Sequence, residues 1–333
     1  MAHERHTVED VARAAGVSLM TVSRAMNGRP GVGEKTRKRV LEIAARMGYR
    51  PSRVARGLAS RSASALGIVF PDMANPFFAI LAKAATDVAR SRDVNVFIIN
   101  TDEDPGRELL ALESLHAERI DGVIVAASRL PARSLREEIL RFKAPVLVNS
   151  LVTGPGIANV DVDDRSGMLE AVAHLFARGR RRIAFVAGPR ESGSARRRLS
   201  GYRAGLTAAD FPFDQRLVSR CKPDIEGGQR AITALLEREP EIDAVIAHND
   251  ITAIGVLRGL QRAGRRVPED VAVIGVDDIP YAALVHPSLS TLRVDIAEIG
   301  RRAMTALLDL RDGKPVESLL PLHPELVLRE STD

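Results

Sequence analysis

Residues 7–26 read TVEDVARAAGVSLMTVSRAM, which contains two short helical patterns with a turn between them. The apolar residues of the first pattern recur at i, i+3, i+4 and i+7, so they share one helical face: Val8, Val11, Ala12 and Ala15. Gly16 ends this helix, because glycine adopts the left-handed conformation of a C-cap without strain. Ser18 can cap the second helix, LMTVSRAM, which turns Val22 inward.

A third helical pattern follows the break NGRPGVG. It spans residues 34–47, repeats the apolar stripe and is closed by Gly48. Its stripe consists of Val40, Ile43, Ala44 and Met47. Three helices with a tight turn between the first two predict an all-α helix-turn-helix head, whose turn fixes the angle at which the second helix projects.

The second helix is the candidate for insertion into the major groove of DNA. We expect Leu19, Met20 and Arg24 to meet base edges, since arginine reads guanine and apolar side chains contact thymine methyl groups. Hydroxyl and amide side chains around them are expected to hold phosphates: Thr7, Ser18, Thr21, Ser23 and Asn27. The alternative is a three-helix bundle with a solvated basic face.

Positive charge is concentrated in this N-terminal part. Residues 1–62 hold 13 Lys and Arg and 5 Asp and Glu, a net charge of +8, whereas the other 271 residues hold 35 and 38, a net charge of −3. A small basic module on a mildly acidic body is typical of a protein that binds a polyanion with one end. A basic tail that merely adds solubility is the alternative, but this segment is periodic rather than low in complexity.

Residues 7–61 resemble the head of the lac repressor (LacI/GalR) family of bacterial transcription regulators. The elements DVA, AGVS, TVSR, TR and GYRP stand in the register of that family. By resemblance, Leu19, Met20 and Arg24 occupy the base-reading positions of the family. The residues placed beside the DNA backbone are Thr21, Ser23 and Asn27. Gly33 departs from the family, which usually has serine as the cap of the third helix, but glycine is a tolerable cap.

Residues 51–64, PSRVARGLASRSAS, are polar, basic and without an apolar stripe, which predicts a linker. A helix as short as RVARGL is unstable by itself. In the family, the matching segment is a hinge helix that forms on the operator and enters the minor groove. By resemblance Leu58 is the wedge that opens a central base step, Ala55 lets two such helices approach, and Arg53 belongs to the same DNA contact.

From residue 65 onward, apolar runs of strand length alternate with helical patterns. The runs are LGIVF (66–70), VFII (96–99), GVIVAA (122–127), VLVN (146–149), IAFVAG (183–188), AVIAH (244–248) and VAVIGV (271–276). Continuous apolar strands separated by helices predict parallel sheets covered on both faces. Because the same rhythm occurs in both halves, we expect an α/β fold of two doubly wound lobes with a ligand cleft at the carboxyl ends of the strands.

Polar residues follow these strands, and they are the candidate ligand contacts: Asp72, Asn75, Asp102, Ser128, Asn149, Ser192, Ser194, Asn249, Asp250, Asp277 and Asp278. This part of the chain resembles the effector domain of the same family, which is similar to a type I periplasmic sugar-binding protein. Segments such as PDMANPFFAIL, HLFARGRRRIAFVAGP and HNDITAIGVL carry the resemblance.

The resemblance implies that Phe77 and Phe78 wall an effector pocket. The residues expected to contact the effector are Ser192, Ser194, Arg198, Asn249 and Asp277. The fork of an arginine and the two acceptors of an aspartate can together grip adjacent hydroxyls of a sugar-like molecule. For each of these residues the alternative is a structural ion pair or a cap at a strand end.

The segment RCKPDIEGG bears on the identity of the effector. Family members often supply there an aromatic residue that stacks on the ligand, whereas this chain has Pro223 and no tryptophan. A sugar, sugar acid or sugar phosphate is therefore favoured over a flat purine-like molecule. Apart from Arg198, the arginines at 178–182 and 196–198 are expected to be solvated surface.

Enzyme signatures do not occur in the sequence. Gly154 and Gly156 are not followed by the helix of a dinucleotide fingerprint, and there is no Walker phosphate loop. Seven scattered histidines and the single Cys221 form no metal-ligand cluster, and that thiol is expected to be buried or incidental. We therefore expect no catalysis, cofactor or metal. Without a signal peptide or an apolar span, we expect a cytoplasmic protein that does not contact a membrane.

The expected organisation is a DNA-binding domain at 1–50, a hinge at 51–64 and an effector-binding and dimerisation domain at 65–333. The first lobe of that domain should comprise about 65–161 and 293–320, and the second about 162–292 and 321–330. The sequence thus predicts a repressor that acts as a homodimer on a pseudo-palindromic operator under the control of a small-molecule effector. A solute-binding protein or a sugar-modifying protein of the same fold is the alternative.

Overall fold

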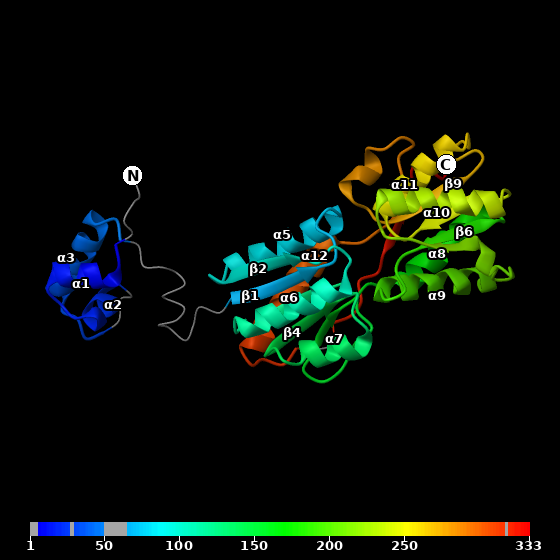
Figure 1. Cartoon of the computed structure of the whole chain (residues 1–333). Coiled ribbons are helices and arrows are strands. Elements are labelled where there is room, and N and C mark those ends of the chain that lie inside the picture. The colour runs from blue at the N-terminus through cyan, green and yellow to red at the C-terminus, as the bar shows by residue number, and fades with distance from the viewer. Residues whose placement is uncertain (1–5, 27–29, 50–64, 317–318) are drawn as a thin grey trace. The chain divides into compact units, whose positions relative to one another are not determined.

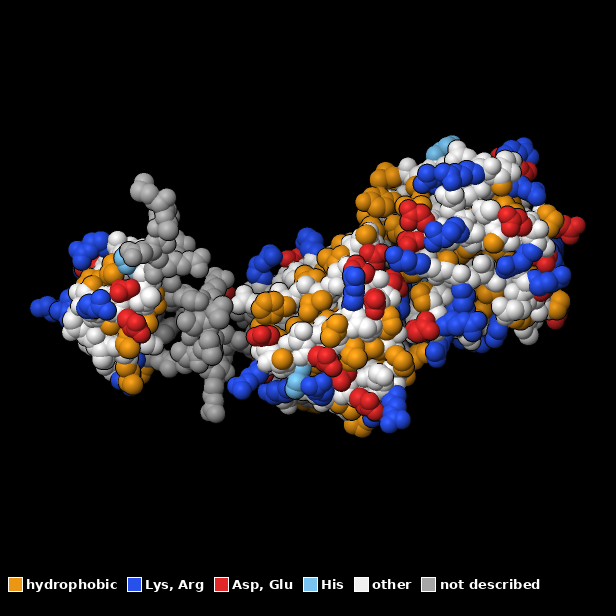
Figure 2. Space-filling view, in the orientation of Figure 1, with side chains coloured by type: hydrophobic (Ala, Val, Ile, Leu, Met, Phe, Trp, Pro, Cys, Tyr) orange, Lys and Arg blue, Asp and Glu red, His pale blue; other side chains and the backbone are white. Residues whose placement is uncertain are grey.

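The computed structural model describes residues 6–26, 30–49, 65–316 and 319–333. The chain divides into two compact units, residues 1–64 and 65–333, and each is described by itself. Among the described helices, none combines the length and apolarity that crossing a membrane requires. Over the visible face of the larger unit, basic and acidic side chains are interspersed (Figure 2).

In its described residues, 6–26 and 30–49, the smaller unit is a three-helix cluster, as predicted, with α1 (Val8–Ala15), α2 (Leu19–Met26) and α3 (Glu34–Arg46). One valine from each helix is fully buried where the three meet: Val11, Val22 and Val40. The sharp turn between α1 and α2 depends on Gly16, which ends α1 with a φ of 59°. This confirms the helix-turn-helix geometry that the sequence predicts.

Local side-chain bonds fix the starts of these helices. Thr7 and Asp10 form a reciprocal capping box at the start of α1. The Ser18 hydroxyl accepts a hydrogen bond from the backbone N–H of Thr21 at 3.2 Å, as expected for the cap of α2. Gly33 precedes α3 in an extended conformation and provides no side-chain cap, so the third helix lacks this bond.

The larger unit consists of two lobes, each a sheet between two layers of helices (Figure 1). The first sheet has the order β2-β1-β3-β4-β5, and all its strands are parallel. Its strands are β1 (Ala65–Phe70), β2 (Asn95–Asn100), β3 (Gly122–Ala126), β4 (Ala144–Val148) and β5 (Ala158–Val160). Helices α5 (Pro76–Arg90) and α12 (Ile296–Arg311) cover one face, and α6 (Pro105–Ala117) and α7 (Ala132–Ile139) cover the other.

The second sheet has the order β11-β10-β9-β8-β6-β7. Its strands are β6 (Ile183–Ala187), β7 (Val218–Arg220), β8 (Ala244–Ala247), β9 (Ala272–Asp277), β10 (Ser290–Arg293) and β11 (Glu325–Val327). Helices α8 (Asp164–Ala177) and α9 (Gly193–Ala208) pack on one face, and α10 (Ile225–Arg238) and α11 (Asp250–Arg262) on the other. This lobe also contains the short 3₁₀ helices η1 (Gln215–Leu217) and η2 (Pro280–Ala283).

All seven strands predicted from apolar runs are present, and the described part of the chain holds four short strands that escaped prediction. Strands β5, β7 and β11 are only three residues long, and β10 begins with Ser and Thr. Strand β11 pairs antiparallel with β10, so the expectation of wholly parallel sheets is wrong at this edge. Such short or polar segments become strands because a neighbouring strand offers them hydrogen bonds, which no local pattern encodes.

The chain crosses between the lobes at three places: after β5, after β10 and between α12 and β11. As a result α12 belongs to the first lobe, where Gly300 lies so close to α5 that a Cβ would come within 2.3 Å of the Leu81 carbonyl oxygen. A short parallel bridge between Val162 and Leu322 joins the first and third crossings. The carboxyl ends of the parallel strands in both sheets face the space between the lobes (Figure 1).

Candidate functional site

A cleft of about 440 Å³, measured with its open mouth, lies between the lobes. Residues from both lobes line it: Asp72, Asn75, Phe77, Phe78, Glu103, Ala127, Arg129, Asn149, Ser194, Arg198, Pro223, His248, Asn249 and Asp277. The cleft thus combines an aromatic wall with several charged and amide groups.

The backbone at the strand ends turns these side chains into the cleft. Ala127, Asn149 and Asp277 follow or end β3, β4 and β9 with φ angles of 50°, 54° and 116°. L-residues rarely adopt such positive angles, and each costs of order 1–3 kcal/mol. The surrounding structure imposes this strain where the chain leaves the sheets, which is typical of a ligand-binding edge.

The aromatic wall comes from the first turn of α5. Asn75 caps this helix, accepting a hydrogen bond from the backbone N–H of Phe77 at 3.0 Å. The rings of Phe77 and Phe78 meet edge to face with centroids 5.2 Å apart, and Phe78 also packs on Phe70 of β1. The wall is therefore anchored in the core of the first lobe.

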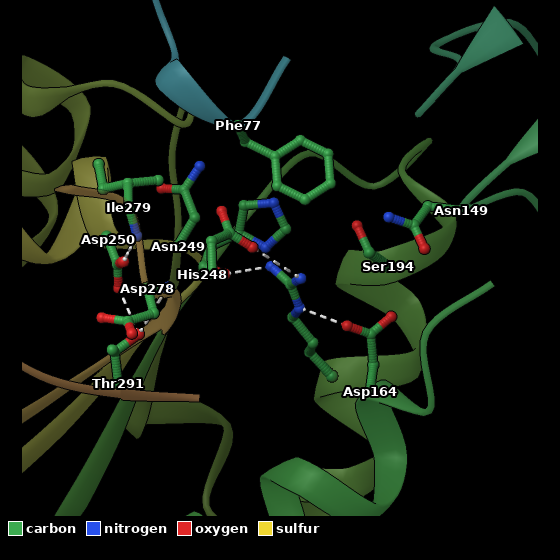
Figure 3. A network of polar contacts seen from close by, with 12 residues as sticks. Phe77, Asn149, Asp164, Ser194, His248, Asn249, Asp250, Asp278, Ile279 and Thr291 are labelled. Carbon is green, nitrogen blue, oxygen red and sulfur yellow. Dashed lines mark hydrogen bonds and ion pairs between the residues drawn. The ribbon is translucent and has the colours of Figure 1, made fainter. Parts of the chain in front are cut away.

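Arg198 occupies the second-lobe side of the cleft and is 5% exposed. Its Nε donates to the carboxylate of Asp164 at 2.7 Å, and its Nη1 donates to the carbonyl oxygen of His248. Figure 3 labels Asp164 and His248 and draws these bonds as dashed lines. Its Nη2 lies 3.6 Å from Asp277. A buried guanidinium needs such partners, because the desolvation of an unpaired charge costs several kcal/mol.

Asp277 has an unusual proton affinity. Burial raises the pKa of Asp277 to about 7, although the nearby Arg198 opposes the shift. Burial also raises the pKa of its neighbour Asp250 well above the usual range, and the Asp277 charge adds to the effect. Asp277, on the second-lobe side of the cleft, therefore gains or loses its proton near neutral pH.

Arg129 provides a second buried guanidinium, on the first-lobe side. It grips the carboxylate of Glu103 through both Nε and Nη2, the latter at 2.9 Å, and its Nη1 donates to the carbonyl oxygen of Ala127. Glu108 supports this pair by accepting bonds from the Ser128 hydroxyl and from the Arg129 backbone N–H. Both arginines that line the cleft are thus paired with carboxylates of the protein itself.

Six of the seven residues expected to contact the effector line this cleft: Phe77, Phe78, Ser194, Arg198, Asn249 and Asp277. Ser192 does not; its hydroxyl caps α9 by accepting from the backbone N–H of Ala195, and it bonds the Ser194 hydroxyl at 3.0 Å. Ser192 is therefore a support for its neighbour. Sequence reasoning missed four lining residues as ligand contacts: Glu103, Ala127, Arg129 and His248. Glu103 and Arg129 belong to no recognised motif, whereas Ala127 ends the run GVIVAA and His248 begins the segment HNDITAIGVL.

Arg197 corrects a second expectation. The sequence assigned it to the solvated surface, but it reaches from α9 to the first lobe. It donates to Asp164 at 3.0 Å, to the Asn149 side chain at 3.2 Å and to the Ser150 carbonyl oxygen at 3.2 Å. This side chain joins the two lobes beside the cleft.

The residues expected to read bases are on the surface of the smaller unit. Leu19 and Met20 are 48% and 64% exposed at the start of α2, and Arg24 is exposed on the same helix. Adjacent exposed apolar side chains are typical of a contact surface.

The hydroxyls of Thr7, Ser18 and Thr21, which were expected to hold phosphates, make the local bonds at the helix starts. Four further candidates lie outside the described residues: Asn27, Arg53, Ala55 and Leu58.

The described residues hold no group of three or more His, Cys, Asp and Glu side chains placed to bind a metal ion. Cys221 packs partly buried against the core of the second lobe. Burial raises its pKa to about 12, so the thiol stays protonated at neutral pH. This cysteine does not offer a ready nucleophile.

The raised pKa of Asp277 predicts a pH-dependent stability. Between about pH 4 and pH 7 the folded protein holds a proton that the unfolded chain releases, so the free energy of unfolding falls as pH rises. Asp277→Asn removes this dependence. Relative to the original chain, the variant should gain roughly 2–3 kcal/mol between pH 5 and pH 8 in urea unfolding followed by circular dichroism.

Asp270→Asn is the matched control, because Asp270 is only half-buried and its hydrogen bonds with Arg266 lower its pKa to about 2. Its effect on stability should be the same at both pH values. If Asp277→Asn also changed the free energy of unfolding by the same amount at pH 5 and pH 8, the raised pKa of Asp277 would be contradicted.

Two family models match the chain. Residues 7–52 match bacterial regulatory proteins of the lacI family, and residues 63–319 match the periplasmic binding proteins and sugar binding domain of the LacI family. Among curated proteins, the catabolite control protein A of Priestia megaterium is 33% identical over 329 residues, which cover 98% of this chain and 99% of the relative.

Solved structures agree with these matches. A lac repressor dimer bound to operator and the anti-inducer ONPF has a TM-score of 0.85 and 28% identity, covering 99% of each chain. A complex of the transcriptional regulator CelR with cellobiose has a TM-score of 0.73 and 30% identity, covering 98% of this chain and 100% of the other. The chain therefore belongs to the lacI family, and it is a DNA-binding transcriptional regulator with a sugar-binding type of effector domain rather than an enzyme.

Proposed function

We propose that this regulator is a cytoplasmic repressor that binds a pseudo-palindromic operator as a homodimer and is controlled by an effector in the cleft. The observation that carries the proposal is the combination, in one chain, of a helix-turn-helix with exposed Leu19, Met20 and Arg24 and a two-lobed cleft lined by paired charges. One recognition helix reads too few base pairs for genomic selectivity, so two heads are needed.

On DNA, Leu19, Met20 and Arg24 contact base edges in the major groove. Hydroxyl and amide side chains near them hold the phosphates: Thr7, Ser18, Thr21, Ser23 and Asn27. The hinge residues Arg53, Ala55 and Leu58 contact the minor groove, and the leucine opens a central base step. The structural likeness to a lac repressor dimer on its operator supports this assignment.

The effector is an uncharged saccharide or polyol. Arg129 and Arg198 are already paired with carboxylates, and an anion in the cleft would also meet Glu103, Asp277 and Asp72. A sugar acid or phosphate would have to break a buried ion pair, at a cost of several kcal/mol. Hydroxyl groups can instead bond to the free lone pairs and amides of such a site. The CelR complex with cellobiose supports a ligand of this class.

Dimerisation uses the free edge of the first sheet. Strand β2 pairs only with β1 in the described sheet, and its Phe97 and Ile98 are 54% and 42% exposed. An apolar edge strand is a template for association. In the second lobe, Leu284 and Tyr281 are 77% and 50% exposed, and Figure 2 shows hydrophobic side chains gathered over the η2 segment. Both lobes thus offer apolar surface to a second copy.

The control mechanism is a linkage between cleft and hinge. An effector that bridges the lobes changes their separation, which permits or prevents pairing of the two hinge segments in the dimer. A coupling of about 1–3 kcal/mol changes operator affinity by about 5- to 150-fold. Because a short hinge helix is marginally stable by itself, so small a free energy is sufficient.

Selection of binding sites from random duplex DNA tests the DNA-binding proposal. The purified chain should enrich a sequence with two half-sites related by a dyad. Leu58→Ala should weaken binding to this sequence far more than binding to random DNA, because the wedge acts only at the opened step. Failure to enrich any sequence, or equal losses on both DNAs, would contradict the proposal.

Thermal-shift measurements test the effector class, since a ligand of the folded state raises the Tm. We expect a shift with one of D-glucose, D-galactose, D-ribose and cellobiose, and none with D-gluconate or D-glucose 6-phosphate. Asp277→Ala should abolish the shift and leave operator binding without effector intact. A response only to the charged compounds would reject an uncharged effector.

Phe97→Lys tests the dimer surface. Burying a charge at a paired β2 edge should raise the dimer dissociation constant about tenfold or more, measured by sedimentation at several concentrations. Leu140→Lys is the control, because Leu140 is a similarly exposed apolar residue, 46% exposed, at the end of α7. A Phe97→Lys protein that dimerises as tightly as the control would exclude this edge.

A further inference from the structure

His248 stands directly after β8 and lines the second-lobe side of the cleft. It is only 4% exposed. Its Nδ1 is one of the few buried side-chain polar atoms in the described ranges that has no hydrogen-bond partner, and it is the one that belongs to a cleft residue. A buried group left in this state costs about 1–3 kcal/mol, and such groups call for an explanation.

The imidazole is held in place on its opposite side. A Cβ on Gly188 would lie 2.7 Å from the Cδ2 and Nε2 atoms of the ring, so only glycine at this position leaves room for it. The carbonyl oxygen of His248 accepts the Nη1 bond from Arg198, which fixes the backbone as well (Figure 3). Backbone and ring are therefore preorganised before any ligand arrives.

The surroundings keep this imidazole uncharged. Burial lowers the pKa of His248 well below its usual value, and the positive charges of Arg198, Arg129 and Arg220 lower it further. A neutral imidazole has one N–H donor and one acceptor nitrogen. It can bond a hydroxyl group in either direction, but it offers no charge to attract an anion.

We propose that the Nδ1 atom of His248 makes a direct hydrogen bond to one hydroxyl of the effector and thereby determines which saccharide the cleft accepts. This inference rests on the proposed saccharide effector and adds to it the residue that selects among sugars. It accounts for a rigid, uncharged and unpartnered polar group in a cleft where both lining arginines are already paired. A site built around one hydroxyl discriminates strongly against an analogue that lacks it.

Isothermal titration of the full-length chain tests the inference. The probe is whichever of D-glucose, D-galactose, D-ribose and cellobiose binds the original chain most tightly, together with its monodeoxy analogues. His248→Leu should lose about 10- to 100-fold in affinity, which is the loss expected for one unmade bond in a buried site. His248→Asn should stay within about threefold of the original, because an amide atom can occupy the position of Nδ1.

The deoxy analogues separate a direct contact from a loss of structure. One analogue should bind the original chain about 10- to 100-fold more weakly than the parent sugar, and His248→Leu should bind this analogue and the parent equally. His174→Leu is the matched control, because His174 lies on α8, also has a buried ring nitrogen without a partner and does not line the cleft. It should retain the affinities of the original chain.

If one of the sugars binds the original chain, two results would overturn the inference. One is sugar affinity unchanged by His248→Leu. The other is an equal loss for the parent sugar and every analogue, with His248→Asn failing to restore binding. If the original chain binds none of the four sugars, the saccharide effector itself is wrong and the inference falls with it. Operator binding without effector and the Tm of each variant are recorded to establish that the variants fold.

Discussion

Arg198 carries a full charge inside the protein, and the geometry of the cleft depends on how that charge is satisfied. Its three nitrogen donors reach Asp164, His248 and Asp277, which come from three different segments of the second lobe. Asp164 begins α8 directly after the chain has crossed from the first lobe. Because removing one partner of a buried ion pair costs about 3–5 kcal/mol, this cluster fixes the crossing, two strand ends and the cleft floor together.

A second buried acid connects the cleft to the segments between the lobes. Asp250, next to Asn249, accepts bonds from the Thr291 hydroxyl at 2.6 Å and from the Ile279 backbone N–H at 2.9 Å. Thr291 lies on the strand that leads into the second crossing, and the Ile279 side chain packs in the core of the first lobe. A ligand that moves the strand ends therefore acts directly on the parts of the chain that set the lobe arrangement.

Sequence reasoning succeeded where burial is encoded locally. Val11 and Val22 were recognised as core residues because helical periodicity places them on one face, and β3 and β8 were recognised because buried parallel strands read as continuous apolar runs. It failed for β10 and β11, whose strand character comes from their neighbours. It also failed for Arg197, which bonds Asn149 and Ser150 in the other lobe. The sequence also predicted Ser192 as a cleft residue, whereas its hydroxyl caps the start of α9.

The sequence by itself determined the basic helical head, the two-lobed α/β body and the family, because periodicity, charge and motifs are properties of neighbouring residues. Only the tertiary structure decided how the cleft is charged. Arg129 pairs with Glu103, 26 residues away in the sequence, and Arg198 pairs with Asp164, 34 residues away. The Nδ1 atom of His248 has no hydrogen-bond partner. Distances between strand ends depend on sheet order and lobe packing, and a linear pattern carries no measure of them.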